Sequence, residues 1–189
     1  WLPTVESMYP FGIELAAKVH VPGVSGVLEG ECRPGHFDGV CTVVSRLFNQ
    51  VTPDLAAFGK KDYQQLAVIR QMVTDLAFPV EILGGSIVRE ADGLAMSSRN
   101  QYLSDEQRPI AAEIRRTLLQ MRDALTAGAP RAQVEQAAAT RLAQVGYVVD
   151  YTVVRRPDLS EPVDGETGPK VALIAARLGT TRLIDNLEF

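Results

Sequence analysis

The chain has 189 residues, enough for one large domain or two small ones, and its 46% hydrophobic and 22% charged content is ordinary for a globular protein. A formal net charge of −4 argues against non-specific nucleic-acid binding, and no apolar run reaches the roughly 20 residues of a membrane helix. No signal peptide is recognisable, so we expect a cytoplasmic protein with reduced thiols. Cys32 and Cys41 form no CxxC pair and there are only two histidines, which argues against a metal site within this chain.

The amino-terminal third of the chain predicts turns followed by a helix. Residues 18–29 mix β-branched residues with Gly and Pro, which predicts a short strand and turns. Residues 33–39 have little helical propensity and predict a loop. Apolar residues at i, i+3, i+4, i+7, i+8 and i+11 over 40–51 then predict an amphipathic helix.

A strand–helix–strand unit is predicted next. The apolar run 55–58 is typical of a strand buried in a parallel sheet, and 79–83 predicts the following strand. Between them, Asp62 and Gln65 match a capping box that precedes a helical stripe over 66–76. This βαβ order predicts a doubly wound parallel sheet, which is an α/β fold.

The second half of the chain predicts a small α+β domain. Ser104 and Gln107 form a second capping-box pattern, followed by a single helix ending at Gly128 and another over 130–146. Strand-like runs follow at 147–154, 170–175 and 181–184. We therefore expect an incomplete parallel-sheet domain over 1–87 and a smaller α+β domain over 88–189.

The segment from Gly59 to Gln65 concentrates polar side chains between a strand and a helix. Ligands of open α/β sheets lie beyond the carboxyl ends of strands, where helix N–H groups attract phosphate. Lys61 can bind phosphate there, Asp62 can accept from ribose hydroxyls, and Gln65 can contact a polar substrate. The alternative is that the lysines are solvated and Asp62 only caps the helix.

A second polar segment spans residues 96–100. Its two serine hydroxyls and its backbone N–H groups can hold phosphate oxygens, and Arg99 can neutralise charge on a polyphosphate. The alternative is a polar loop whose Ser and Asn side chains cap a helix.

The two histidines give a weaker signal. His36, close to Arg33, can orient a carboxylate or an anhydride, although a structural or exposed role is the alternative. His20 lies among valines and is interpreted as structural. Neither cysteine has a convincing histidine partner, so nucleophilic catalysis is not expected.

Taken together, these segments resemble the pantothenate synthetase (pantoate–β-alanine ligase) family. The resemblance covers essentially the whole chain, and its blocks, in this order, are highly specific. The matching blocks are 28–30, 33–40, 58–66, 88–103 and 178–186.

The resemblance implies a Rossmann-like nucleotidyltransferase domain followed by a smaller carboxyl-terminal domain. It implies a ligase of pantothenate biosynthesis, in the coenzyme A pathway, that acts as a cytoplasmic homodimer on pantoate, β-alanine and ATP with Mg²⁺. In the first step the pantoate carboxylate attacks the α-phosphate of ATP to give pantoyl adenylate and pyrophosphate. In the second, β-alanine attacks the acyl group and releases AMP.

The resemblance also implies roles for individual residues. Lys61 would contact phosphate, Asp62 would lie near ribose, and the Val88 backbone would meet adenine. The residues implied for ATP binding are Gly59, Lys60, Lys61, Asp62, Val88, Met96, Ser97, Ser98 and Arg99. The residues implied for catalysis are Lys61, Ser97, Ser98 and Arg99. Those implied for substrate binding are Gln65 on pantoate, with His36 and Arg33 near the acyl or β-alanine side.

Two departures from the family pattern stand out. Lys60 occupies a position where the family more often has Glu. The family's amino-terminal nucleotide motif, with its histidines, pantoate-binding Gln and acidic Mg²⁺ ligand, has no match here, so we expect the chain to be the latter part of a longer protein and inactive by itself. The alternatives are another adenylate-forming nucleotidyltransferase and an inactive fragment that only folds or dimerises.

Overall fold

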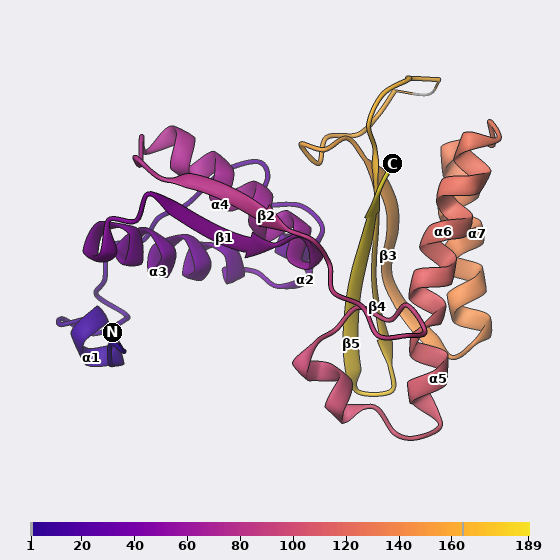
Figure 1. Ribbon diagram of the computed structural model, residues 1–189, viewed down its shortest axis with the longest axis horizontal. Helices are drawn as coiled ribbons and strands as arrows, with labels where there is room; N and C mark the ends of the chain where they lie inside the picture. The colour runs from indigo at the N-terminus through magenta and orange to yellow at the C-terminus, as the bar shows by residue number, and fades with distance from the viewer. Residues whose placement is uncertain (1, 164) are drawn as a thin grey trace. The chain divides into compact units, whose positions relative to one another are not determined.

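The computed structural model describes residues 2–163 and 165–189 and divides the chain into two compact units. Unit 1 comprises Trp1–Phe58 and Gln64–Gly85, and unit 2 comprises Gly59–Tyr63 and Ser86–Phe189. Unit 1 contains a parallel pair of strands and unit 2 an antiparallel sheet of three, each with its own helices (Figure 1). The predicted α/β class is therefore confirmed.

The first half of the chain forms the predicted βαβ unit. Its elements are α1 (Val5–Met8), α2 (Glu29–Cys32), α3 (His36–Val51), β1 (Leu55–Gly59), α4 (Tyr63–Asp75) and β2 (Glu81–Gly85). Strand β1 pairs with β2, and α4 connects them. Core residues of α3 and α4 pack against the inward positions Ala56, Phe58 and Ile82 of the two strands. The outward positions Leu55 and Leu83 are exposed, so the strands are not buried on both sides as their uniform composition suggests.

Two local predictions for unit 1 are wrong. Over 18–28 the expected turns are present at 22–28, where Gln64 binds the carbonyls of Val24 and Val27, but the expected short strand is absent. The predicted loop over 33–39 contains the first turn of α3, which begins at His36. Gly35, with a φ of 76°, adopts the left-handed conformation that allows the chain to turn into this helix.

Unit 2 follows the predicted order of helices and then strands. Its elements are η1 (Lys60–Asp62), η2 (Ser98–Tyr102), α5 (Gln107–Ala111), α6 (Glu113–Thr126), α7 (Arg131–Gln144), β3 (Tyr147–Arg155), β4 (Val171–Leu178) and β5 (Thr181–Glu188). The capping box is confirmed: the Ser104 N–H donates to Gln107 Oε1 at 3.1 Å, and the Gln107 N–H donates to Ser104 Oγ at 3.3 Å.

The single helix predicted to end at Gly128 is divided into α5 and α6. At the break, the Ala111 carbonyl accepts a hydrogen bond from Tyr147 Oη at 3.1 Å. The Arg115 N–H bonds to the Ala112 carbonyl, one residue short of the α-helical spacing. The tertiary hydrogen bond from Tyr147 is found at a break that lies three residues after Pro109, the proline within α5.

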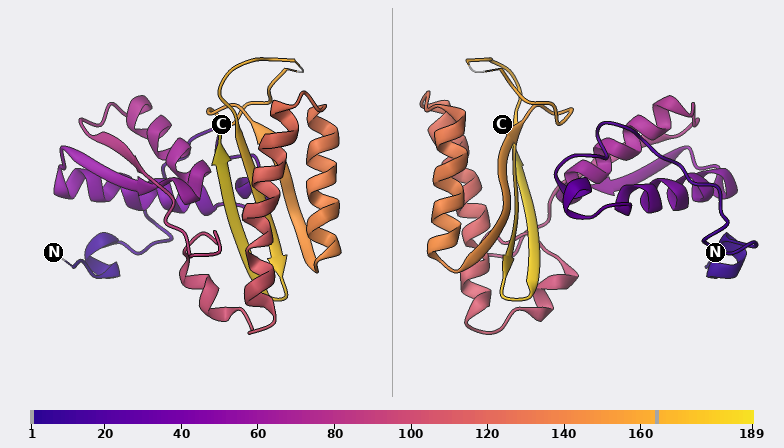
Figure 2. Two further views of the ribbon diagram at one scale, coloured as in Figure 1. Left: turned by 45° about the vertical axis from the view of Figure 1, so that its right-hand side comes forward. Right: turned by 180° about the vertical axis from the view of Figure 1, so that it is seen from behind.

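The sheet of unit 2 has the strand order β3-β4-β5, with antiparallel neighbours. Strands β4 and β5 form a hairpin in which Leu178 is opposite Thr181 and Val171 is opposite Glu188. Helices α6 and α7 lie together on one face of this sheet (Figure 2). The main core of unit 2 fills the space between them, with Leu118, Leu142 and Ile174 almost wholly buried.

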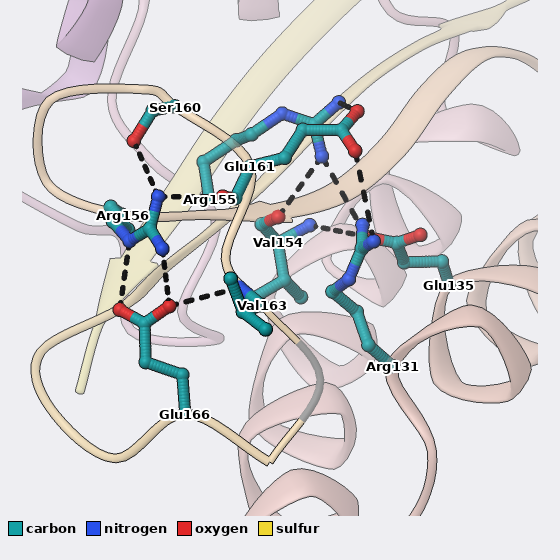
Figure 3. A network of polar contacts seen from close by, with 9 residues as sticks. All are labelled: Arg131, Glu135, Val154, Arg155, Arg156, Ser160, Glu161, Val163 and Glu166. Carbon is teal, nitrogen blue, oxygen red and sulfur yellow. Dashed lines mark hydrogen bonds and ion pairs between the residues drawn. The ribbon is translucent and has the colours of Figure 1, made fainter.

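Ion pairs hold the segment that connects β3 to β4. Arg156 donates from Nε to Glu166 at 2.7 Å and from Nη1 to the Glu161 carbonyl at 2.7 Å (Figure 3). Close by, Arg155 lies 3.2 Å from the carboxylate of Glu161, so both arginines contact this residue, and only Arg156 also contacts Glu166. Hydrogen bonds from Arg156, and then from the Val163 backbone, lower the pKa of Glu166 from its usual 4.5 to about 2.

The stabilisation that the ion pair between Arg156 and Glu166 contributes should depend on pH. Because folding lowers the pKa of Glu166, its stabilising contribution is fully present above about pH 4.5 and is lost as the pH falls towards 2. In the Arg156→Gln variant the midpoint should rise from about 2 towards 4.5, with the Val163 hydrogen bond still lowering it, as measured by carbon NMR of the Glu166 carboxyl group. Arg155→Gln is the matched control and should leave that midpoint near 2; an unchanged midpoint in Arg156→Gln would contradict the assignment.

Candidate functional site

Unit 2 contains both of the polar segments expected to bind ATP. The segment 59–62 and the segment 96–99 lie far apart in sequence, yet Lys61, Ser97 and Arg99 line one narrow cavity of about 10 Å³. The remaining lining residues are Leu94, Ala95, Asn100, Ile114, Arg182, Leu183, Ile184 and Asp185. A volume of this size holds about one water molecule, so the cavity marks where the polar groups converge and is too small to enclose a nucleotide.

The segment that carries Lys61 is a single 3₁₀ turn held by strand β5. Asn186 Nδ2 donates to the carbonyl oxygens of Lys60 at 2.8 Å and of Lys61 at 3.0 Å. The ammonium of Lys60 lies 2.6 Å from Glu188, and that of Lys61 lies 3.5 Å from Asp62. The Lys61 side chain is 21% exposed and lines the cavity, and its ammonium faces the half-exposed carboxylate of Asp62.

The segment from Met96 to Arg99 leads into the 3₁₀ helix η2. Ser97 is the residue before this helix, and its Oγ accepts from the Arg99 N–H at 3.2 Å. The capping role weighed as the alternative is thus present, and the Ser97 hydroxyl hydrogen is still available to a ligand. The Arg99 guanidinium donates to the Arg182 carbonyl at 3.5 Å, and Ser98 is exposed.

A short hairpin before η2 brings Val88 next to Met96. The Met96 N–H donates to the Val88 carbonyl at 2.9 Å, and both side chains are half or more exposed. Arg89 stabilises the hairpin by donating to the Gly93 carbonyl at 3.0 Å and to both carboxylate oxygens of Asp185 at 2.7 and 3.0 Å. These contacts tie the hairpin to β5, the strand that also holds Lys60 and Lys61.

Charged side chains from α5 and α6 lie near this hairpin. A hydrogen bond from Arg108 lowers the pKa of Asp92 in the hairpin turn. Burial, and then the positive charge of Arg89, lower the pKa of Arg115. The buried carboxylate of Asp185 interacts with both of these guanidinium groups, so its negative charge offsets their mutual repulsion.

The residues expected to bind the acid substrates lie in unit 1. Arg33 Nη1 is 3.1 Å from His36 Nε2, at the start of α3, and Gln65 is partly buried in the first turn of α4. When Arg33 donates, His36 Nε2 accepts, which requires the neutral ring with its proton on Nδ1. His20, expected to be structural, is exposed and has its Nδ1 2.8 Å from Asp38 Oδ1.

Gln64 is a structural residue of this region to which the sequence assigned no role. Its Nε2 donates to the carbonyls of Val24 at 2.8 Å and Val27 at 2.7 Å, and its Oε1 accepts from the Glu29 N–H at 3.0 Å. The side chain is therefore saturated, and Gln64 is 3% exposed. It fixes the turns before α2 to the first turn of α4, beside Gln65.

Neither a metal-binding cluster nor a membrane-spanning helix is found in the described part of the chain. Across 2–163 and 165–189, no group of three His, Cys, Asp or Glu side chains is placed to hold a metal ion. Within the same ranges, no helix is both long and apolar enough to cross a membrane.

Comparisons with known proteins agree in sequence and in structure. The family model described as Pantoate-beta-alanine ligase matches residues 1–188. Pantothenate synthetase of Xanthomonas euvesicatoria pv. vesicatoria (strain 85-10) is 78% identical over all of this chain, which spans 68% of that relative's length. Pantothenate synthetase of Xanthomonas oryzae pv. oryzae (strain PXO99A) is 77% identical with the same coverage.

Solved structures of similar proteins show the same arrangement of elements. Pantothenate synthetase from Thermus thermophilus superposes with a TM-score of 0.90 at 46% identity, over 98% of this chain and 67% of that one. Pantoate-beta-alanine ligase from Francisella tularensis, complexed with beta-gamma ATP and beta-alanine, gives a TM-score of 0.75 at 27% identity, over 96% and 61%.

Replacing Gln64 by Ala should unfold the turns that precede α2. Three hydrogen bonds are lost and buried backbone groups are left unpaired, which should lower the free energy of unfolding by about 2–4 kcal/mol. Gln65→Ala is the matched neighbour and should cost less than about 1 kcal/mol. Urea unfolding together with amide hydrogen exchange over 24–29 measures both, and equal losses in the two variants would contradict the assignment.

Proposed function

This chain belongs to the pantoate–β-alanine ligase family, and we propose that its polar segments serve the ATP-dependent condensation of pantoate with β-alanine to pantothenate. The pantoate carboxylate attacks the α-phosphorus of ATP, which forms pantoyl adenylate and releases pyrophosphate. The amine of β-alanine then attacks the acyl carbon, and AMP leaves. The Francisella relative complexed with a nucleotide and β-alanine supports this substrate set.

The observation that carries the proposal is the convergence of Lys61, Ser97 and Arg99 on one cavity of unit 2. Adenylation brings a carboxylate against a polyphosphate, so repulsion between two anions is the main barrier to reduce. Two cationic side chains and a hydroxyl, held by backbone contacts, lower that barrier by positioning and by neutralising charge. A solvated lysine in a plain loop would not share a cavity with a serine and an arginine from a different segment.

Other residues of unit 2 have assigned parts in nucleotide binding. Asp62, about half exposed, can accept from ribose hydroxyls, and Gly59 has nothing near its α-carbon to block a ligand. The Val88 backbone would meet the adenine ring, and Met96, half exposed on the same hairpin, would close on the nucleotide. Lys60 takes part through the backbone of η1, and the exposed Ser98 through its hydroxyl.

We assign the acid substrates to residues of unit 1. Gln65 offers both a donor and an acceptor to the hydroxyl and carboxylate groups of pantoate. Arg33 and His36 form one hydrogen-bonded pair, which would lie near the acyl group or β-alanine. In this pair the guanidinium supplies the charge, because the ring nitrogen that faces it acts as an acceptor.

Mg²⁺ is expected to accompany ATP. The described residues contain no cluster of carboxylates or histidines that would hold it, so the site residues of this chain do not fit a bound metal on their own. Lys61 and Arg99 are the side chains that this chain itself contributes to neutralising charge. We also propose a cytoplasmic homodimer, and analytical ultracentrifugation tests the dimer.

Pantoate-dependent exchange of pyrophosphate into ATP tests the proposed function. The assay should be run on the 189-residue chain and on the same chain joined to the part of its Xanthomonas relative that it does not span. Exchange that requires pantoate, followed by AMP release on addition of β-alanine, is expected from the longer protein. Exchange with a different acid would favour another adenylate-forming enzyme, and ATP binding without any exchange would favour a non-catalytic role.

Lys61→Ala should slow the adenylation step with little effect on stability. Removing a charge aimed at the transition state should raise the barrier by about 2–4 kcal/mol, roughly a hundredfold or more in rate. Lys18→Ala, which removes one exposed lysine outside both polar segments, is the control and should change the rate less than about twofold. Single-turnover formation of pantoyl adenylate measures the step, and a normal rate in Lys61→Ala would remove this residue from its assigned role.

A further inference from the structure

Two adjacent polar residues in the middle of strand β5 hold both ATP-binding segments. We propose that Asp185 and Asn186 are positioning residues that fix the spacing between the Lys60–Asp62 turn and the hairpin that carries Val88 and Met96. The inference rests on the proposed ATP site, and neither residue needs to touch the nucleotide. Both side chains are buried, at 4% and 3% exposure for the residues as a whole, so their partners are the protein groups they contact.

Asn186 acts on the turn that carries Lys61. Its single amide nitrogen supplies both of its hydrogens, one to the carbonyl of Lys60 at 2.8 Å and one to that of Lys61 at 3.0 Å. A 3₁₀ turn of three residues has little internal hydrogen bonding to keep it in place. These two bonds therefore set where the Lys61 side chain begins.

Asp185 acts on the hairpin. Its carboxylate receives two hydrogen bonds from Arg89, and Arg89 also donates to the Gly93 carbonyl in the hairpin turn and to the Asn186 carbonyl at 3.4 Å. Arg89 lies next to Val88 in sequence and is bridged to Ala95, the neighbour of Met96. A bidentate pair fixes orientation as well as distance, so the hairpin is oriented relative to β5.

The geometry of a strand explains how neighbouring residues serve different segments. Successive side chains of β5 point to opposite faces of the sheet, so Asp185 and Asn186 cannot reach the same partner. Asp185 lies between Leu183 and Leu187, which pack with the helix-side core, and it meets Arg89 there. Asn186 reaches η1 from the other face. One pair of neighbouring residues thus fixes the positions of both ATP-binding segments.

Asn186→Ala tests the contact with η1 by two independent readouts. Hydrogen exchange of the amides over 60–63 in the 189-residue chain, without ligand, should quicken about tenfold or more when both bonds are lost. Calorimetric titration with ATP should show about tenfold weaker binding. In the pyrophosphate-exchange assay of the longer protein, the KM for ATP should rise while the KM for pantoate is unchanged. A general loss of folding would not change one KM and leave the other.

Glu188→Gln is the matched control in the same strand. Glu188 lies two residues further, on the same face as Asn186, and contacts the ammonium of Lys60 rather than the backbone of η1. It should leave the exchange of 60–63 and the affinity for ATP within about twofold. A loss in Glu188→Gln as large as that in Asn186→Ala would overturn the inference, because surface charge alone would then explain both.

Arg89→Lys tests the second contact and guards against a variant that fails to fold. Lysine keeps the charge opposite Asp185 but cannot engage both carboxylate oxygens. The Met96 amide, which bonds to Val88, should exchange faster while the rest of unit 2 is unchanged, and ATP affinity should fall about tenfold. Unchanged affinity in both Arg89→Lys and Asn186→Ala, measured in the longer protein whose parent form binds ATP normally, overturns the inference. A longer parent protein that does not bind ATP overturns the proposed function instead.

Discussion

The buried ion pair between Asp185 and Arg89 is the interaction on which the candidate site depends. An ionised carboxylate inside a strand is costly unless its oxygens are fully paired, and Arg89 supplies two hydrogen bonds to it. The same guanidinium also donates to the hairpin turn. Fixing Arg89 therefore also fixes the position of the hairpin that bears Val88 and Met96. The position of the site in unit 2 is thus set by a pair that has no part in the chemistry.

Most of the helices and strands could be predicted from the sequence. Each buries one face, and the buried face leaves a regular spacing of apolar residues along the chain. The βαβ unit, the capping box at Ser104 and the three strands of unit 2 were all found in this way. Two of the places where the prediction was wrong or incomplete have a hydrogen bond from a distant residue. Tyr147 binds the carbonyl at the break between α5 and α6, and Gln64 binds the carbonyls of Val24 and Val27 in the segment 18–29, where a short strand and turns were expected. Such partners lie 36 to 40 residues away and leave no mark on periodicity.

The candidate site was partly visible in the sequence for a different reason. Lys61, Ser97 and Arg99 have side chains whose chemistry suggests phosphate, so composition alone drew attention to them. The residues that position them were missed because Asn, Asp and Gln have many ordinary uses. One signal was present: Asp185 and Asn186 lie between the apolar residues Ile184 and Leu187, and both residue types are depleted in strands. Gln64, next to the predicted ligand Gln65, carried no comparable signal.

Gln64 and Asn186 show why an amide suits the task of holding an irregular segment. Each uses one nitrogen to bind two backbone carbonyls, and Gln64 uses its oxygen to accept an N–H as well. A lysine could also donate to carbonyls, but its charge would be buried and, beside Lys61, would repel the cation meant for the phosphates. An aspartate would repel the same carbonyls. The neutral donor adds no charge of its own beside Lys61 and Arg99, and so the electrostatic character of the site is set by the side chains that line the cavity.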